Sequence, residues 1–374
     1  MKKDIALITF HAAYNYGSML QAYATQETVN RLEGNCAIIN YRMKEQKDYY
    51  ALLRSKYGLT TLAKDIVLIP FMRKRKLAAD RYEDFINNKL NVTEEFSEPE
   101  DIGRIWDEYE IAISGSDQIW NKHAFELEHN DWKYMYPYLL KGFQGKKVSY
   151  ASSIGGMSDS ELEMIIPYLN QFDSISVRED KIKSKLEKVL NTKIHSVLDP
   201  TFLLSSSEWI NNLSLKKKEQ EPYILYYSLR GYKLAIPRLK VLKELARQKK
   251  CKIKVITPSF YIPYFDSHFE YLFDLGPIEF LEELYNASMV VSESYHGTIL
   301  AINFNKDVYS IVGKVGAEYR KSELLKKLGM EDRIIYNVDE LLSEKEDIDY
   351  KKVNERIAIN KTLSIDYLAN ALEL

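Results

Sequence analysis

The chain has 374 residues, which is enough for two domains that each have a hydrophobic core. Hydrophobic residues make up 45% and charged residues 28% of the sequence, and the net charge of −2 provides no basic field for nucleic acid. No apolar run approaches the roughly 20 residues that span a bilayer, and the first one is too short for a secretory signal, so we expect a cytoplasmic protein.

The first 41 residues alternate between strand and helix patterns. Residues 5–10 (IALITF) form a continuous apolar run, as in a parallel strand buried on both faces, and residues 36–41 form the next strand. The loop HAAYNYGS connects the first strand to a helix that ends at a glycine. Because this loop follows a strand end, we expect Asn15, Tyr16 and Gly17 to contact a ligand. The loop lacks the GxGxxG spacing of a dinucleotide site.

Residues 66–90 have the pattern of a helix that is broken or kinked at Pro70. An apolar patch at residues 66–72 is followed directly by four basic residues, RKRK. The pattern allows two interpretations, which are a solvated helix face and a contact with a membrane surface or a lipid-linked substrate.

The segment GSDQIWN follows a predicted strand at residues 109–114. A polar loop at a strand end can bind a ligand, and Asp117 is a candidate general base. Alternatively, Ser116 or Asp117 could cap the following segment. Further elements are expected as strands at residues 147–152, 175–180 and 197–200 and as a helix at residues 182–190.

Three serines at residues 205–207 and a charged stretch at residues 215–221 indicate a linker region, after which a second sheet starts at Tyr223. Arg230 lies just past the first strand of this sheet, where its planar guanidinium could bind a phosphate or a carboxylate. The remaining predicted elements are strands at residues 251–256, 289–291 and 307–312 and helices at residues 234–249, 275–285, 322–328 and 362–374.

Residues 289–304 (MVVSESYHGTILAINF) combine a short strand, a polar loop and a helix. A helix N-terminus at a strand end binds anions through its N–H groups and its dipole. His296 could donate a proton beside a bound phosphate or carboxylate, or it could only cap the helix. Gly297 would let a ligand approach the backbone.

The strand–helix alternation occurs twice, which predicts an α/β protein of two doubly wound Rossmann-like domains that face a cleft. We place the domains at residues 1–205 and 206–374, with the last helix packing back on the first domain. The two cysteines, Cys36 and Cys251, lie in separate apolar runs and are expected to be buried free thiols. No Cys/His cluster has the spacing of a zinc site.

The motifs of the chain resemble those of the polysaccharide pyruvyl transferase family. In chain order they are ITFHAAYNYGSMLQAYA near the start, ISGSDQIWN at 113–121, YASSIG at 149–154, ISVRED at 175–180, VLDPTFLL at 197–204, YSLR at 227–230, SESYHGTILA at 292–301 and LLKKLGMEDR at 324–333. The set spans nearly the whole chain in one order, and this makes the resemblance specific.

The resemblance implies a GT-B-like enzyme that transfers a pyruvyl group from phosphoenolpyruvate to two hydroxyls of a sugar, forming a cyclic ketal. It implies no metal and no cofactor beyond this donor substrate. The acceptor would be a sugar or a lipid-linked oligosaccharide, which would bring the protein to the inner face of the membrane. We expect the catalytic residues His296 and Asp117, the donor-binding residues Arg230, Ser294, Gly297, Thr298 and Arg320, and the acceptor-binding residues Asn15, Tyr16, Gly17, Ser116, Gln118 and Trp120.

The chain departs from the family at residues 294–296, where it reads Ser-Tyr-His and many members read Arg-Leu-His. We expect Arg320 to supply the missing donor contact. The departure leaves two alternatives open. One is a GT-B glycosyltransferase that uses a nucleotide-sugar, with Glu293 or Glu318 binding the ribose, and the other is a glycan-binding relative without catalysis.

Overall fold

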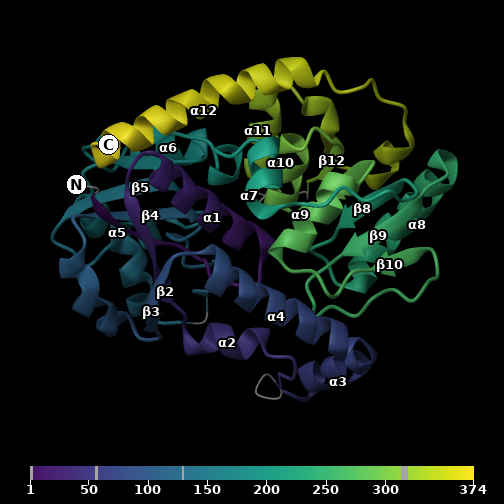
Figure 1. The fold of residues 1–374 in the computed structure, drawn as a ribbon, viewed down its shortest axis with the longest axis horizontal. Helices are drawn as coiled ribbons and strands as arrows, with labels where there is room; N and C mark the ends of the chain where they lie inside the picture. Colours follow the sequence, from purple (N-terminus) through teal and green to yellow (C-terminus); the bar gives the residue numbers. More distant parts are fainter. Residues whose placement is uncertain (1–2, 55–57, 129, 313–318) are drawn as a thin grey trace. The chain divides into compact units, whose positions relative to one another are not determined.

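The computed structural model describes residues 3–54, 58–128, 130–312 and 319–374. The chain forms two compact units, and each is built on its own parallel sheet (Figure 1). The first unit comprises Met1–Asp48, Asp84–Leu204 and Ile357–Leu374, and the second comprises Tyr49–Glu83 and Ser205–Arg356. The α/β architecture with two Rossmann-like domains agrees with the sequence prediction.

The first unit contains a sheet of seven parallel strands in the order β3-β2-β1-β4-β5-β6-β7. Its elements are β1 (Asp4–Ile8), α1 (Tyr16–Arg31), β2 (Asn35–Tyr41), α2 (Lys44–Tyr50), β3 (Val92–Phe96), η3 (Pro99–Glu108), β4 (Ile111–Asp117), η4 (Trp132–Leu139), β5 (Lys146–Ser152), α5 (Asp159–Leu169), β6 (Ile175–Val177), α6 (Asp180–Leu186), β7 (Ile194–Ser196) and η5 (Pro200–Phe202). The strand order reverses between β1 and β4, and ligands of open α/β sheets bind at such a reversal.

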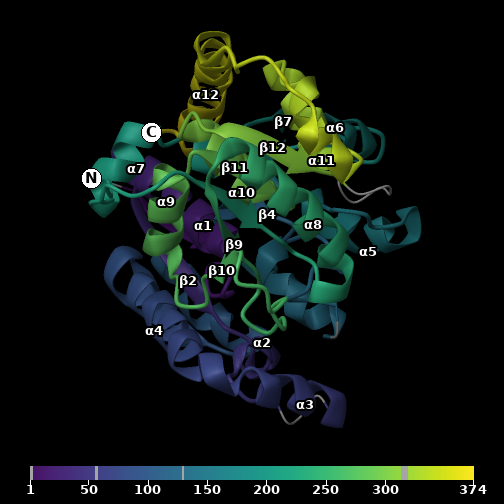
Figure 2. The same cartoon turned by 90° about the vertical axis from the view of Figure 1, so that its right-hand side faces the viewer.

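The second unit contains a sheet of six parallel strands in the order β10-β9-β8-β11-β12-β13 (Figure 2). It contains all or part of the following elements, of which α4 and α12 each extend into the first unit: α3 (Leu59–Val67), η2 (Ile69–Phe71), α4 (Met72–Lys89), α7 (Ser206–Leu213), β8 (Tyr223–Tyr227), α8 (Tyr232–Lys249), β9 (Lys252–Ile256), β10 (Phe269–Tyr271), α9 (Pro277–Asn286), β11 (Met289–Ser292), α10 (Tyr295–Asn303), β12 (Asp307–Ile311), α11 (Tyr319–Leu328), η7 (Glu331–Arg333), β13 (Ile334–Ile335), η8 (Val338–Leu342) and α12 (Tyr350–Leu372). The order reverses between β8 and β11.

Several edge strands differ from the sequence prediction. Residues 197–200 do not form the expected strand. The strand of this region is β7, which ends at Ser196. The pattern also missed β3, β10 and β13, which lie at the edges of the two sheets. β10 and β13 have only three and two residues, and β3 buries only Phe96, so these strands lack the continuous apolar run that marks the central strands.

The predicted break at Pro70 is confirmed, because α3 ends at Val67 and α4 starts at Met72. The predicted linker after Leu204 instead contains α7. Ser205 caps this helix through the backbone N–H of Glu208, and the side chain of Glu208 returns a bond to Ser205. The Ser-x-x-Glu spacing was therefore a helix signal that the linker interpretation overlooked.

The final helix, α12, is longer than predicted, and residues 357–372 of it belong to the first unit. The Tyr367 hydroxyl donates to the carbonyl of Ser149 at 2.9 Å, and the backbone N–H of Leu198 donates to Ser364 Oγ at 2.9 Å. Both cysteines are free thiols, with Cys36 buried and Cys251 half-buried. No helix in the part of the chain that the structure describes is long and apolar enough to cross a membrane.

Candidate functional site

A network of charged residues lies at the strand reversal of the first sheet. Asp117 ends β4, and its Oδ1 atom lies 3.1 Å from Nη2 of Arg178. Nη1 of the same guanidinium lies 2.8 Å from Oδ2 of Asp199, and Ser18 Oγ lies 3.5 Å from Asp117 Oδ2. Arg178 and Asp199 are fully buried, whereas Asp117 stays partly exposed. The network therefore presents one carboxylate, Asp117, at the edge where a ligand is expected.

The structure brings only part of the predicted acceptor set to this edge. Asn15 is exposed and caps α1 by accepting from the backbone N–H of Gly17 at 2.9 Å, and Tyr16 is buried as the first residue of that helix. Gln118 is half-buried and accepts a hydrogen bond from Asn121. Asn15 and Tyr16 lie at the start of α1, after β1, and Gln118 lies on the loop that follows β4.

The side chains of Ser116 and Trp120 are completely buried. Ser116 Oγ donates to the carbonyl of Ala151 at 3.1 Å, and the indole N–H of Trp120 donates to the carbonyl of Tyr138 at 3.0 Å. This placement corrects the prediction that they contact a sugar, because both side chains serve the fold. The burial of Trp120 is a tertiary feature that the motif does not encode.

Glu126 is a titratable group near Asp117 that the sequence motifs did not reveal. Burial, reinforced by the negative charge of Asp117, raises the pKa of Glu126 from 4.5 to about 7. A carboxyl group that titrates near neutral pH can take up or release a proton during a reaction. Glu126 lies nine residues beyond β4 in a segment without a recognisable motif, so only the folded environment identifies it.

The raised pKa of Glu126 predicts a specific pH dependence of stability. The folded state favours the protonated carboxyl, so this contribution to stability is fully present below pH 4.5 and is lost as the pH rises through 7. In Glu126→Gln the side chain stays neutral, and the variant should gain up to roughly 3 kcal/mol relative to the wild type between pH 4.5 and 8. Urea unfolding at both pH values measures this difference, and a difference that does not change with pH would contradict the assignment.

A second cluster lies at the strand reversal of the second sheet, around the buried carboxylate of Glu293. Its Oε1 atom accepts from the Tyr226 hydroxyl at 2.6 Å and lies 3.3 Å from Nη1 of Arg238. Its Oε2 atom accepts from the backbone N–H of Leu229 at 3.1 Å and lies 3.7 Å from Nε of Arg230. Glu293 therefore fixes the loop after β8 and draws two guanidinium groups to the strand ends.

Two further cations approach the same strand ends from α11. The ammonium of Lys321, which is almost completely buried, donates to the carbonyl of Glu293 at 2.7 Å and to the carbonyl of Ile311. The guanidinium of Arg320 lies over the ring of Tyr295, 5.3 Å from its centre. The structure thus places Arg320 beside the start of α10, which is the position expected for a side chain that replaces the family's missing arginine. Residues 313–318 of the preceding loop, including Glu318, lie outside the described residues.

The first turn of α10 is closed by its own residues. Ser294 caps the helix by accepting from the backbone N–H of Gly297 at 3.2 Å, and the Thr298 hydroxyl donates to the carbonyl of Ser294 at 2.9 Å. A Cβ atom at Gly297 would lie 2.6 Å from Ser292 Oγ and 2.7 Å from the ring of Tyr227. Gly297 is therefore needed for packing of the helix on the strands. We expect Ser294, Gly297 and Thr298 to shape the site rather than to contact the donor.

His296 is the second residue of α10 and lies at the same strand ends. Its side chain is largely buried, and its ring meets the ring of Tyr295 edge to face at 5.4 Å between centroids. The sequence motifs pointed to His296 and Arg230 as residues at these strand ends, but they did not point to Arg238 or Lys321. Arg238 lies eight residues after Arg230 on α8, and only the fold turns it toward Glu293.

Two Rossmann-like units, each built on a parallel sheet whose strand order reverses once, have a fold of the GT-B type. The sequence model of the family described as "Polysaccharide pyruvyl transferase" matches residues 15–313. The chain therefore belongs to the polysaccharide pyruvyl transferase family. No curated protein matches the chain by sequence.

Solved structures with the same fold have very different sequences. A Listeria monocytogenes protein assigned as a UDP-N-acetylglucosamine 2-epimerase is 10% identical, with a TM-score of 0.55 over 99% of this chain and 91% of that chain. The Arabidopsis thaliana protein UGT89C1, solved with UDP-L-rhamnose, is 10% identical, with a TM-score of 0.52 over the full length of both chains. At this identity the similarity establishes the fold alone.

Proposed function

We propose that the protein transfers a pyruvyl group from phosphoenolpyruvate to two hydroxyls of a sugar and forms a cyclic ketal. The observation that carries the proposal is the convergence of Arg230 and Arg238 on the strand ends where α10 begins with Tyr295 and His296. Phosphoenolpyruvate bears a phosphate and a carboxylate, and guanidinium groups bind both with paired hydrogen bonds. Family membership supports the same reaction class.

In the proposed reaction, His296 donates a proton to the methylene carbon of phosphoenolpyruvate, and positive charge develops at C2. One sugar hydroxyl attacks C2 and loses its proton, and the phosphate leaves with the electrons of the C–O bond. The second hydroxyl then closes the ring. The sum is one diol and one phosphoenolpyruvate converted to one ketal and one phosphate. Arg230 and Arg238 would stabilise the departing phosphate.

For the acceptor we propose the first unit, where Asp117 and Glu126 are the candidate groups for removing the hydroxyl proton. Asp117 is held by Arg178 and Ser18 at the strand ends. Glu126, with a pKa of about 7, can hold or release a proton near neutral pH. The acceptor would be a sugar of a polysaccharide or of its lipid-linked precursor.

A glycosyltransferase that uses a nucleotide-sugar is the competing proposal, because UGT89C1 shares the fold. That proposal would use Glu293 to bind a ribose. Both oxygens of Glu293 already accept hydrogen bonds from Tyr226 and the Leu229 backbone, and both face an arginine. A ribose at Glu293 would have to displace the hydrogen bonds of a carboxylate that is 5% exposed. The Arg230 side chain is 42% exposed and accessible to an anionic donor, so we favour phosphoenolpyruvate.

The test measures release of phosphate from phosphoenolpyruvate with galactose-, mannose- and glucosamine-containing acceptors. The proposal expects release that depends on an acceptor, together with stabilisation of the protein against heat by phosphoenolpyruvate and less by UDP. Stabilisation by UDP alone, without phosphate release, would favour the nucleotide-sugar reaction. Glycan binding without release would favour a binding protein that lacks catalysis.

A further inference from the structure

The elements α3, η2 and α4 follow one another in the chain and form a hairpin in the second unit (Figures 1 and 2). Several apolar side chains of this hairpin are exposed. Ala63, Ile66 and Val67 are exposed and follow the i, i+3, i+4 spacing of one face of α3, and Pro70 is exposed in η2. The exposed large apolar side chains of these elements are Ile66, Val67, Ile69 and Leu77, and Leu53 and Phe265 are exposed on the segments that contact them through Arg54–Asp65 and Phe71–Phe265. All six are between 42% and 68% exposed. We call this set the hairpin patch. A helix of a globular protein normally turns its apolar face inward, so an apolar face toward solvent needs an occupant.

The exposed charged groups around the hairpin patch are mainly basic, with Asp80 near Leu77 and Asp266 next to Phe265 as acidic neighbours. Among the described side chains of residues 61–79, every exposed charged group is basic, and these groups are Lys64, Arg73, Lys74 and Lys76. Lys76 pairs with Asp80 at 2.9 Å, whereas Lys64, Arg73 and Lys74 form no ion pair with another described residue. The chain as a whole has a net charge of −2, so this basic rim is a local feature.

Buried contacts hold the hairpin in place and keep the patch outward. Asp65, on the inner face of α3, accepts from Nη2 of Arg54 at 2.6 Å, and Nη2 of Arg75 lies 4.0 Å from the same carboxylate. The guanidinium of Arg54 also lies over the ring of Phe260 at 5.0 Å. At the turn, Phe71 packs against Phe273, with 4.8 Å between ring centroids. The outward position of Ile66 and Ile69 is therefore fixed by the inward contacts of their neighbours.

We propose that the hairpin patch docks on the surface of a bilayer that contains anionic lipids. The apolar side chains would enter the headgroup boundary, and the basic rim would contact the lipid phosphates. Charge complementarity selects this occupant over a second copy of the chain, because two basic rims facing each other would repel. The inference concerns binding alone and does not depend on the proposed reaction.

Sedimentation with vesicles tests the proposal on the full-length protein. The wild type should bind vesicles of phosphatidylcholine with about one third phosphatidylglycerol, bind pure phosphatidylcholine weakly, and lose affinity at high salt. Two double variants should each bind vesicles about tenfold more weakly. One replaces Ile66 and Ile69 with Ser, and the other replaces Arg73 and Lys74 with Gln. All four side chains are exposed, so the variants should keep the melting temperature of the wild type.

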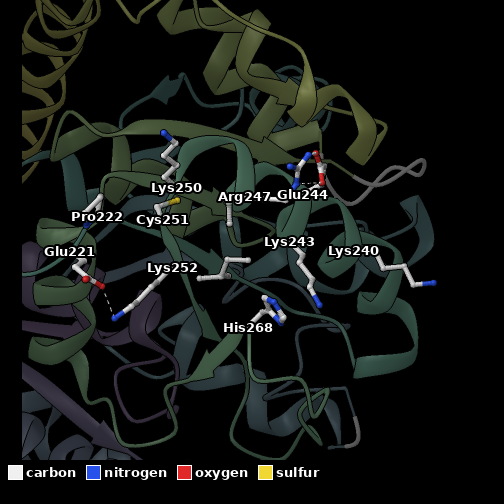
Figure 3. Close-up of a pocket in the computed structure, with 12 residues that line it drawn as sticks. Glu221, Pro222, Lys240, Lys243, Glu244, Arg247, Lys250, Cys251, Lys252 and His268 are labelled. Carbon is white, nitrogen blue, oxygen red and sulfur yellow. Dashed lines mark hydrogen bonds and ion pairs between the residues drawn. The ribbon is translucent and has the colours of Figure 1, made fainter.

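Two matched controls separate the patch from general surface properties. Lys240 and Lys250 line a basic cavity of about 690 Å³ between α8 and β9, where their side chains extend away from the fold (Figure 3). Replacing both with Gln removes the same charge as the Arg73 and Lys74 pair. Met164→Ser with Val189→Ser removes comparable exposed apolar surface in the first unit. Both controls should bind vesicles as the wild type does.

The proposal is overturned if the wild type does not sediment with anionic vesicles, or if the hairpin variants and the controls lose affinity equally. It is also overturned if the wild type is a dimer that the Ile66 and Ile69 pair makes monomeric while vesicle binding is absent. That result would make the patch an interface between two copies of the chain.

Discussion

Replacing His296 with Gln should lower acceptor-dependent release of phosphate from phosphoenolpyruvate by about 100- to 10,000-fold, the usual contribution of a general acid. Gln keeps a similar size and polarity but cannot donate the proton that the methylene carbon needs. His296 lies at the N-terminal end of α10, beside the strand ends where Arg230 and Arg238 converge. The variant should therefore still bind the donor. Its apparent affinity for phosphoenolpyruvate, measured from heat stabilisation, should stay within about twofold of the wild-type value.

His195→Gln is the matched control for this loss. His195 lies on β7, at the edge of the first sheet, and its ring packs against the ring of Tyr367 at 4.9 Å. The substitution should leave the rate unchanged. A His296→Gln enzyme with the wild-type rate would remove His296 from the chemistry, and a variant that fails to bind phosphoenolpyruvate would make it a binding residue instead.

Arg178→Met should reduce the free energy of unfolding by about 3 to 5 kcal/mol. The Arg178 guanidinium contacts Asp199 at 2.8 Å and Asp117 at 3.1 Å, and its Nε lies 3.8 Å from Oε1 of Glu179. Met fills a similar volume without charge, so the buried carboxylates of Asp199 and Glu179 would lose this cation. Urea unfolding followed by tryptophan fluorescence measures the change.

The control for Arg178 is Arg104→Met in the same unit. Arg104 pairs with Asp101 at 2.6 Å, but its side chain is 73% exposed. Exposed pairs of this kind contribute little, so the variant should stay within about 0.5 kcal/mol of the wild type. Equal losses in the two variants would mean that the burial of Arg178 has no special role.

The sequence predicted the parts of the molecule that local patterns determine. Continuous apolar runs marked the central strands, and the polar residues before His296 marked the start of α10, where Ser294 is the cap. The break at Pro70 was predictable because proline cannot continue a helix. These features depend on neighbours in the chain.

The missed features depend on residues that are distant in the chain. Lys321 reaches the site because α11 follows β12 to the same strand ends, and nothing in its local sequence distinguishes it from a surface lysine. The pKa of Glu126 depends on burial and on Asp117, and the burial of Trp120 depends on Tyr138. The motifs therefore lie at the two strand reversals. They do not distinguish residues that are expected to face a ligand from residues that support the fold.

The most direct measurement is the mass of a sugar acceptor after incubation with the enzyme and phosphoenolpyruvate labelled with ¹³C in its pyruvyl carbons. The proposal predicts an acceptor that gains one labelled pyruvyl group as a ketal, with one phosphate released for each group transferred. An acceptor that gains no label from phosphoenolpyruvate, but gains a sugar from a UDP-sugar, would contradict the proposal and establish the nucleotide-sugar reaction.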